Sequence, residues 1–432
     1  MTLMRRIGLA TPLVLALAIA STGLLQGSER LSAALSLSWV VLCIGQQLLA
    51  TPETSRIWPT ALLAILLLNV RGIVLGEGPR PVSHMDYVLL IAAVLAGCGQ
   101  SRQYWRSTLS GLCMAVASCG LWQATTVWHH LNSAEGGYRL GFLLINQTAL
   151  LVGLGCVSGW AALQLWRTPL GCEAPAPAAS RRWIRLALAL GSGGCAVMAL
   201  ATHSRAGVGL IPISLLIAWV LHQGRCHRVE LGHWFRRRGL ASAVVLALLV
   251  GAPLVWLASP QGQGLRHNVA ALYGAENRTS DQGRLQLWRC YAGLPLSGNN
   301  RLIYGVGYGK ARELCPVRLP GRTKPLSHAH NLPLQVWAEA GGLGLVMLLV
   351  GAVLLGRRLL AQQGLPQAQA MALSAPLIYG LLFNLLELGV LKVPLLTVLF
   401  GTVLSGELIK ASSGAGGLPS AGGSTAATAA EP

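Results

Sequence analysis

Long apolar stretches alternate with short polar segments along almost the whole chain. A helix needs about 20 residues to cross a hydrocarbon core about 30 Å thick, and several of these stretches are close to that length. We therefore predict an all-α, polytopic membrane protein in which residues 1–258 carry nine spans and residues 332–410 carry three more. The twelve expected spans are residues 7–25, 31–50, 57–75, 87–99, 108–127, 147–166, 184–202, 207–222, 240–258, 343–356, 370–388 and 393–409.

Composition and charge agree with this pattern and orient it. Of 432 residues, 53% are hydrophobic and only 11% are charged. Connections on one side of the predicted membrane hold 17 Lys and Arg residues, and the short connections on the other side hold 6. Because cytoplasmic loops retain positive charge, both termini should be cytoplasmic. The formal charge of +19 then reflects topology, and without basic patches interleaved with aromatic residues we expect no nucleic-acid partner.

The two ends of the chain allow further interpretations. Arg5, Arg6 and the following apolar run also resemble a secretory signal that is cleaved near Ala18-Ile19-Ala20. We favour an uncleaved first span, because its removal leaves an odd number of spans without improving the charge pattern. Residues 411–432 are rich in Gly, Ser and Ala and nearly uncharged, so we predict a disordered cytoplasmic tail.

One connection is far longer than the others. Residues 259–331 contain no predicted span and carry a net charge of +7 on the side where topology favours few cations. The excess fits either a basic surface against anionic lipids or a site for a multiply anionic substrate such as a diphosphate, which Arg binds through its bidentate fork. A helical pattern surrounds Trp288. GVGYGK, at residues 305–310, lacks the GK[ST] ending of a phosphate-binding loop, and we interpret it as a flexible turn.

The end of this loop carries a candidate general base. Asn331 is a good helix N-cap and Pro333 is tolerated in a first turn, so a helix should begin there. His330 then precedes the positive end of that helix, which disfavours the imidazolium form and leaves a neutral ring that can accept a proton. A histidine that only hydrogen-bonds the loop is an equally weighted alternative. His328, two residues earlier, is a supporting candidate.

Three carboxylates and three glycines could contribute to a site around this histidine. Glu339 is about 13 Å from His330 along a continuous helix, so we expect it to make its own interhelical bond. Asp281 or Glu276 is freer to reach His330. The glycines, which permit close helix approach in bilayers, are Gly341, Gly342 and Gly344.

Arg205 lies in THSRAG, between two predicted spans on the same side as the long loop. Ionisable residues flanked so tightly by apolar segments are costly and are often functional. An interfacial arginine that extends its charge into water is the alternative.

The ten cysteines form no metal-binding signature, and we predict neither a metal site nor a cofactor. Cys290 and Cys315 both lie in the long loop, where an oxidising compartment permits a disulfide. A bridge and two separate thiols are equally consistent with the sequence.

Four stretches together resemble the O-antigen ligases and polymerases of bacterial envelopes. His330-Asn331, nine residues, and then Gly341 and Gly344 are similar to the loop signature of the family. GRLQLW around Arg284, followed by GVGYG, resembles its second loop motif. HSRAG around Arg205 and YRLGFLLINQTAL, at residues 138–150, complete the set, and the resemblance covers essentially the whole chain.

This resemblance implies a GT-C-like, metal-independent, inverting glycosyltransferase in the bacterial inner membrane, with its large loop in the periplasm. The donor would be a glycan on undecaprenyl diphosphate, and the acceptor the lipid A core or another glycan, both in contact with membrane lipids. It implies that His330 is the base and that Arg205 and Arg284 bind the diphosphate, while Arg289, Asp281, His328, Asn331 and Glu339 support them.

Other functions stay open from the sequence. A polymerase would join two lipid-linked repeats, and a protein O-oligosaccharyltransferase would modify Ser or Thr. A membrane solute transporter is the alternative of another class. We weigh it lower because the predicted spans hold almost no central charges, where transporters place their binding groups.

Overall fold

The computed structural model describes residues 13–14, 16–21, 29–50, 102–133, 137–141, 143–167, 178–223, 275–307, 310–317, 329–360, 367–386, 396 and 399. Its regular elements in these ranges are helices, which confirms the all-α class. The spans expected at 57–75, 87–99 and 240–258, and the tail at 411–432, lie outside the described residues. The total of twelve spans therefore stays a prediction.

Most of the described helices lie where the apolar pattern placed them. The helices of the first group are α2 (Glu29–Ala50), α5 (Arg102–Trp122), α6 (Ala124–Asn132), α7 (Ile145–Arg167), α8 (Ala178–Ala201), α9 (Arg205–Gln223) and α16 (Gln367–Leu386). In the described ranges, three helices have the length and apolar character needed to cross a membrane: Ile145–Trp166, Ala179–Ala201 and Leu332–Val350. The chain is a membrane protein.

One predicted span is wrong in its bounds. We expected a single helix over 108–127, but α5 begins at Arg102 and ends at Trp122, and a separate helix, α6, begins at Ala124. Gln123 between them has φ −103° and ψ 26°, outside the helical region. Its side chain accepts a hydrogen bond from the Tyr138 hydroxyl at 2.7 Å, so a tertiary contact accompanies the break.

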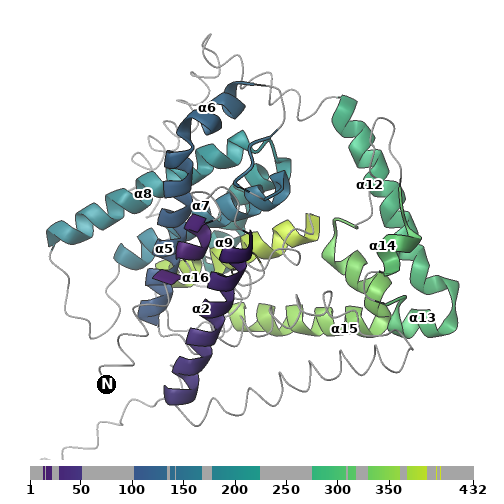
Figure 1. The fold of residues 1–432 in the computed structure, drawn as a ribbon. Helices are drawn as coiled ribbons and strands as arrows, with labels where there is room; N and C mark the ends of the chain where they lie inside the picture. Colours follow the sequence, from purple (N-terminus) through teal and green to yellow (C-terminus); the bar gives the residue numbers. More distant parts are fainter. Residues whose placement is uncertain are drawn as a thin grey trace, which may run out of the picture.

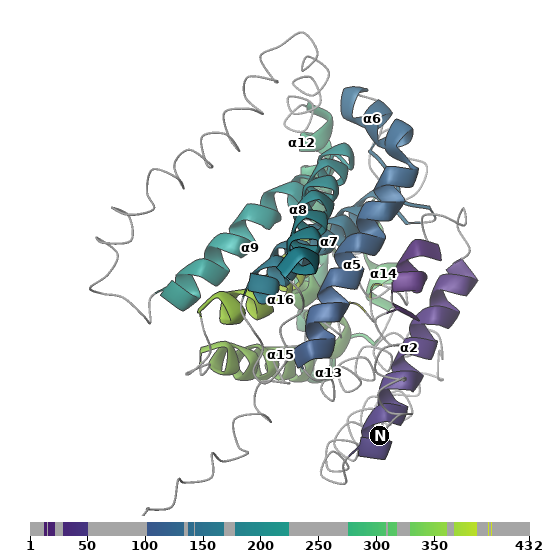
Figure 2. The same cartoon turned by 90° about the vertical axis from the view of Figure 1, so that its left-hand side faces the viewer.

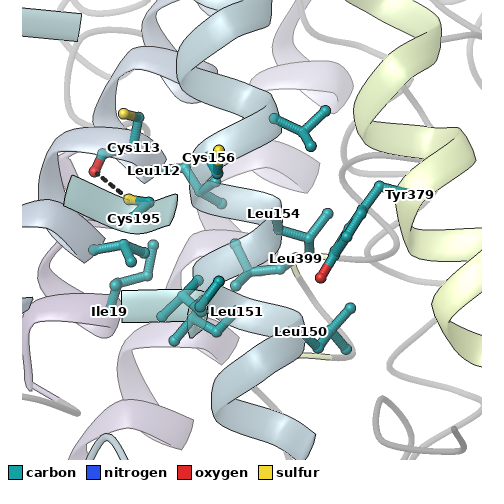
Figure 3. Packing of buried hydrophobic residues seen from close by; sticks show 14 of the residues in the cluster. Ile19, Leu112, Cys113, Leu150, Leu151, Leu154, Cys156, Cys195, Tyr379 and Leu399 are labelled. Carbon is teal, nitrogen blue, oxygen red and sulfur yellow. Dashed lines mark hydrogen bonds between the residues drawn. The ribbon is translucent and has the colours of Figure 1, made fainter. Parts of the chain in front are cut away.

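We call α5, α7, α8, α9 and α16 the helix bundle. The central helix, α7, packs against the other four, and its span is 83% buried within the protein (Figures 1 and 2). Small residues allow this close packing. A Cβ atom added to Gly153 would lie 1.8 Å from the Tyr379 hydroxyl, which is 3.1 Å from the Ala149 carbonyl oxygen and 3.2 Å from that of Gly207. Figure 3 shows Tyr379 directed at α7 beside Leu150 and Leu154.

The second group comes from the long loop. It consists of α12 (Ala275–Gly293), the 3-10 helix η3 (Leu294–Ser297), α13 (Asn299–Tyr304), α14 (Lys310–Leu314) and the start of α15 (Leu332–Leu360). We call α12 to α14 together with residues 329–341 the loop unit. Figure 1 shows α12, α13 and α14 to one side of the helix bundle, with α15 extending from them below α16.

The loop unit has a hydrophobic core of its own. Its buried residues are Leu287, Tyr291, Val306, Ala311, Cys315, Ala329 and Ala338. Cys290 and Cys315 form a disulfide with a Cα–Cα distance of 5.9 Å, so of the two alternatives left open by the sequence, the bridge is confirmed and the pair of free thiols is wrong. The disulfide joins α12 to the segment that follows α14.

A kink at Gly341 divides α15 into two parts. Gly341 has φ 65° and ψ −160°, far from helical values. Before the kink the helix packs against α12 and α13. After it, large apolar side chains are exposed, namely Leu343, Val346, Met347, Leu349, Val350 and Val353. The exposed apolar stretch therefore begins near Leu343, where the predicted span begins, although the helix itself begins eleven residues earlier, at Leu332.

Candidate active site

The predicted start of the helix at Asn331 is confirmed. The Asn331 side-chain oxygen accepts a hydrogen bond from the Leu334 amide at 3.0 Å, and its carbonyl accepts one from the Gln335 amide at 2.9 Å. Both are the bonds of an N-cap residue. His330 therefore lies just before the first turn of α15, half-buried.

The backbone holds His330 in an uncommon conformation. Its φ is 49°, in the left-handed region that costs a residue with a Cβ atom about 1–2 kcal/mol. The preceding residue is anchored on both sides: the carbonyl of the fully buried Ala329 accepts a bond from the Trp288 indole at 2.5 Å, and its amide lies 3.4 Å from the Gln335 side-chain oxygen. These two contacts help to offset the backbone cost and hold the residue that precedes His330 in place.

Within the loop unit, Gln335 also contacts a buried carboxylate. The Gln335 amide donates to the carboxylate of Glu339, which is only 5% exposed. This bond lies within α15, because residues four apart lie on the same face of a helix. Our expectation of an interhelical bond for Glu339 stays a prediction. Burial and then the Glu339 charge raise the pKa of Tyr291, which keeps its phenol neutral. Sequence reasoning missed Gln335, although its spacing from Glu339 was a usable signal.

We call Trp288, Ala329, His330 and Gln335 the histidine platform. Arg284 lies on α12, the helix that contributes Trp288. It is half-buried and precedes Trp288 by four residues, one turn along the same face. Trp288 contacts Ala329, so Arg284 shares the side of α12 that holds His330 in place. Arg289 is exposed on α12.

Two supporting residues lie outside this description. Asp281 is within α12, but nothing is described of its side chain, and His328 is outside the described residues. Their proposed roles stay predictions.

Arg205 is the first residue of α9. Ser204 caps this helix, because its hydroxyl accepts a bond from the Gly207 amide at 3.2 Å. An anion bound here would be stabilised by both the Arg205 guanidinium and the helix start. Arg205 belongs to the helix bundle, whereas Arg284 and His330 belong to the loop unit.

The turn before Arg205 is held by neighbouring segments. His203 has φ 53°, and its Nε2 atom is 2.8 Å from the His130 carbonyl oxygen. The Tyr138 amide donates to the Ala201 carbonyl at 2.9 Å, and the Leu140 amide donates to the Thr148 hydroxyl at 3.0 Å. The stretch at 138–150 therefore supports the turn that presents Arg205, a role that its sequence alone did not reveal.

The glycines of the two loop motifs pack backbone to backbone. The Val306 amide donates to the Ala338 carbonyl at 2.9 Å, and the Gly307 amide donates to that of Glu339 at 3.1 Å. A straight helix would pair these carbonyls with amides beyond Gly341, which the kink displaces. A Cβ atom on Gly341 would lie 2.5 Å from the Gly305 nitrogen. Residues 305–307 are buried, so our interpretation of a flexible turn is wrong for them.

Nothing that the structure describes groups three His, Cys, Asp or Glu side chains in a way that could hold a metal ion.

Comparison with known proteins supports the assignment of these motifs. A family model described as O-antigen ligase matches residues 186–349. The matched segment includes Arg205, Arg284 and His330, together with the glycines of the kink. It confirms the resemblance to O-antigen ligases and polymerases for the part of the chain that carries the site. No curated protein matches the chain.

Proposed function

We propose that this protein, which carries an O-antigen ligase segment at residues 186–349, transfers a glycan from undecaprenyl diphosphate to a hydroxyl of the lipid A core during lipopolysaccharide biosynthesis. The observation that carries the proposal is the platform around His330. Trp288 of α12 holds the residue before His330, and Arg284 lies one turn away on the same helix face. A base and a cation are thereby positioned by one rigid unit.

The chemistry follows from these groups. The imidazole of His330 accepts the proton of the acceptor hydroxyl as that oxygen attacks the anomeric carbon of the donor sugar. The bond between this carbon and the diphosphate oxygen breaks, and the leaving polyprenyl diphosphate takes the electron pair. Attack opposite the leaving group inverts the anomeric configuration.

Arg205 and Arg284 bind the diphosphate in this proposal. Guanidinium groups form bidentate, charge-assisted bonds to phosphate oxygens, and their contribution grows as negative charge develops on the leaving oxygen. Their fixed charges perform the task that a divalent ion performs in other phosphate-transferring enzymes, so we propose a reaction without a metal. Turnover should persist in excess EDTA.

We also propose a place for the protein in the cell. It lies in the bacterial inner membrane with both termini cytoplasmic and the loop unit in the periplasm, where the flipped carrier presents its glycan. Reporter fusions at Gly264 and Gln363 test this topology. They should report periplasm and cytoplasm respectively, and a cytoplasmic Gly264 would overturn the site assignment as well.

Reconstitution of the purified protein with lipid-linked glycan and rough lipopolysaccharide tests the reaction. The lipopolysaccharide should gain the mass of the glycan. Growth of the lipid-linked glycan would instead identify a polymerase, and glycosylated Ser or Thr in an added peptide would identify a protein transferase. If no acceptor gains mass, the transporter alternative gains support.

Substitution of the arginines separates binding from chemistry. Arg205→Ala and Arg284→Ala should each weaken donor binding and turnover, and Lys at either position should rescue only in part because it lacks the planar fork. Arg182→Ala is the matched control, because Arg182 is an exposed cation on α8 near the end opposite the Arg205 turn. It should retain wild-type kinetics.

A further inference from the structure

A small cavity lies in the loop unit between α13 and α14, and its polar side chains are not among those assigned to the proposed reaction. Its volume is about 300 Å³, and its polar lining comes from Asn300, Arg301, Tyr304, Lys310 and Glu313. This is the small end of the range of about 300–1,000 Å³ for ligand pockets, enough for about one sugar ring and its substituent. The proposed transfer reaction uses none of these side chains.

The lining indicates the class of ligand. Arg301 and Lys310 supply two cations against the single carboxylate of Glu313, so the cavity favours an anion. The carboxylate and the Asn300 amide can bond hydroxyl groups, which an inorganic anion does not offer. The ring of Tyr304 is 41% exposed and provides an apolar face for a sugar ring. A sugar that carries a phosphate or carboxylate matches all of these groups.

The floor of the cavity is connected to the histidine platform. Gly305 and Val306 line it, and the Val306 amide bonds the Ala338 carbonyl of α15. A Cβ atom on Gly305 would lie within 2.6 Å of the backbone of Glu339 and Ala340, just before the kink. At 1.5 Å per residue, this level is about 13 Å along α15 from His330.

The cavity lies on the membrane side of His330. Beyond the kink, α15 exposes apolar side chains such as Leu343, Val346 and Met347, which face lipid in a membrane protein. The donor would have only its diphosphate and polyprenyl chain between the reacting carbon and the membrane. In a membrane-anchored acceptor, by contrast, the saccharide connects the reacting hydroxyl to the lipid anchor. That saccharide must therefore pass the cavity.

We propose that this cavity is a subsite for an anionic sugar of the membrane-anchored acceptor, a few sugar units from the hydroxyl that reacts. The proposal rests on the transfer reaction proposed above and names a determinant of acceptor choice. The Arg301 and Lys310 cations bind the phosphate or carboxylate, while Tyr304 contacts the ring.

The test uses the full-length protein in detergent with lipid-linked glycan and rough lipopolysaccharide. Arg301→Gln and Lys310→Gln should each raise the KM for lipopolysaccharide about 5- to 10-fold, since each variant loses a charge-assisted hydrogen bond from a partly hydrated side chain. The donor KM and kcat should not change. Arg312→Gln is the matched control, because Arg312 is exposed on α14 but does not line the cavity.

A second arm changes the acceptor and leaves the protein intact. Lipopolysaccharide freed of phosphate and, separately, lipopolysaccharide with reduced carboxylates are given to the wild-type protein. With one of the two modified acceptors, the wild-type protein should show the raised KM of the variants, and Arg301→Gln should raise this KM no further. The group removed from that acceptor is then the anion that the cavity binds.

Three results would overturn the subsite: an unchanged KM for both modified acceptors, a raised donor KM in the variants, or an equal effect of Arg312→Gln. Failure of the transfer reaction itself looks different. In that case the wild-type protein would add no glycan to any lipopolysaccharide, and His330→Ala would make no difference.

Discussion

The helix bundle and the loop unit are stabilised in different ways. In the bundle, 83% of the α7 span is buried against protein, and small residues let helices approach closely, as at Gly153 and Tyr379. The loop unit has a seven-residue core and adds a disulfide, two tryptophan-to-carbonyl bonds and a glycine contact. Helices in lipid satisfy their own backbone, whereas a small unit in water buries too little apolar area to be stable alone.

The two parts of the proposed site, Arg205 in the bundle and His330 in the loop unit, are therefore positioned in different ways. Arg205 is placed within the bundle by the capped start of α9 and by backbone and side-chain bonds to the turn that precedes it. His330 is placed by discrete bonds, each of which a single substitution removes. Damage to the loop unit should therefore lower catalysis first, and damage to the bundle should lower the stability of the whole protein.

The largest expected effect is removal of the proposed base. His330→Ala should lower kcat about 10²- to 10⁴-fold, because proton transfer to a positioned base is lost while the arginines still bind the diphosphate. Single-turnover assays with radiolabelled donor measure it, and donor binding should barely change. His328→Ala is the internal control and should retain most activity. An essential His328 together with an active His330→Ala variant would show that the helix start identifies the wrong histidine.

The disulfide should matter to the loop unit alone. Cys290→Ser with Cys315→Ser removes a bridge that spans 25 residues, which typically costs about 2–4 kcal/mol. Limited proteolysis should cut the loop unit of this variant first, and dithiothreitol should have the same effect on the wild type. Cys113→Ala, at an unbridged cysteine of the bundle, is the control. Equal protease sensitivity of both variants would remove the distinction between the two regions.

Glycine substitutions should separate the regions by their readout. Gly153→Ala forces Tyr379 away from α7 and should lower the melting temperature, at a cost of about 1–3 kcal/mol. Gly341→Ala adds a Cβ atom at φ 65°, against the Gly305 backbone. It should lower kcat, and it should lower the melting temperature less than Gly153→Ala does. Gly193→Ala, where a Cβ atom meets nothing within 4 Å, should do neither. The reverse pattern would show that the kink does not position His330.

Loss of one bond at the histidine platform should have a smaller effect. Trp288→Phe keeps an aromatic ring but loses the hydrogen bond to Ala329, which contributes about 0.5–1.5 kcal/mol. We expect up to about a tenfold fall in kcat with both KM values retained. Trp122→Phe, at an exposed indole, is the control. An unchanged kcat would mean that His330 is held by its other contacts alone.

The smallest expected effect is on the stability of the protein at acidic pH. Burial lowers the pKa of His203 below its ordinary 6.5, so the unfolded state takes up the proton first as pH falls. The stability that His203 contributes to the Arg205 turn is complete above pH 6.5 and is lost as pH falls toward the lower pKa of the folded state. In the variant His203→Asn, the asparagine tolerates a positive φ but does not titrate in this range. The plot of melting temperature against pH should therefore be flatter below pH 6.5 for this variant. Identical curves for both proteins would exclude the titration.

Local signals in the sequence predicted part of the local structure around the candidate site. The cap at Asn331 is a matter of neighbouring atoms, so the residue type alone placed the start of α15. The predicted span beginning at residue 343 likewise coincides with the start of the exposed apolar side chains on α15. Gln335 and the packing of GVG against α15 were missed, because both depend on which distant segments meet.

What this sequence determined alone is a helical membrane protein with a basic loop and a helix that begins after His330, since apolar run length, net charge and capping are properties of adjacent residues. The disulfide was compatible with the sequence, but the loop core had to bring Cys290 and Cys315 within 5.9 Å between Cα atoms. The kink at Gly341, the cavity beside it and the bond from Trp288 to Ala329 arose only on folding. Each of these needs two segments far apart in the chain to lie in contact, and the chain order does not specify which segments pair.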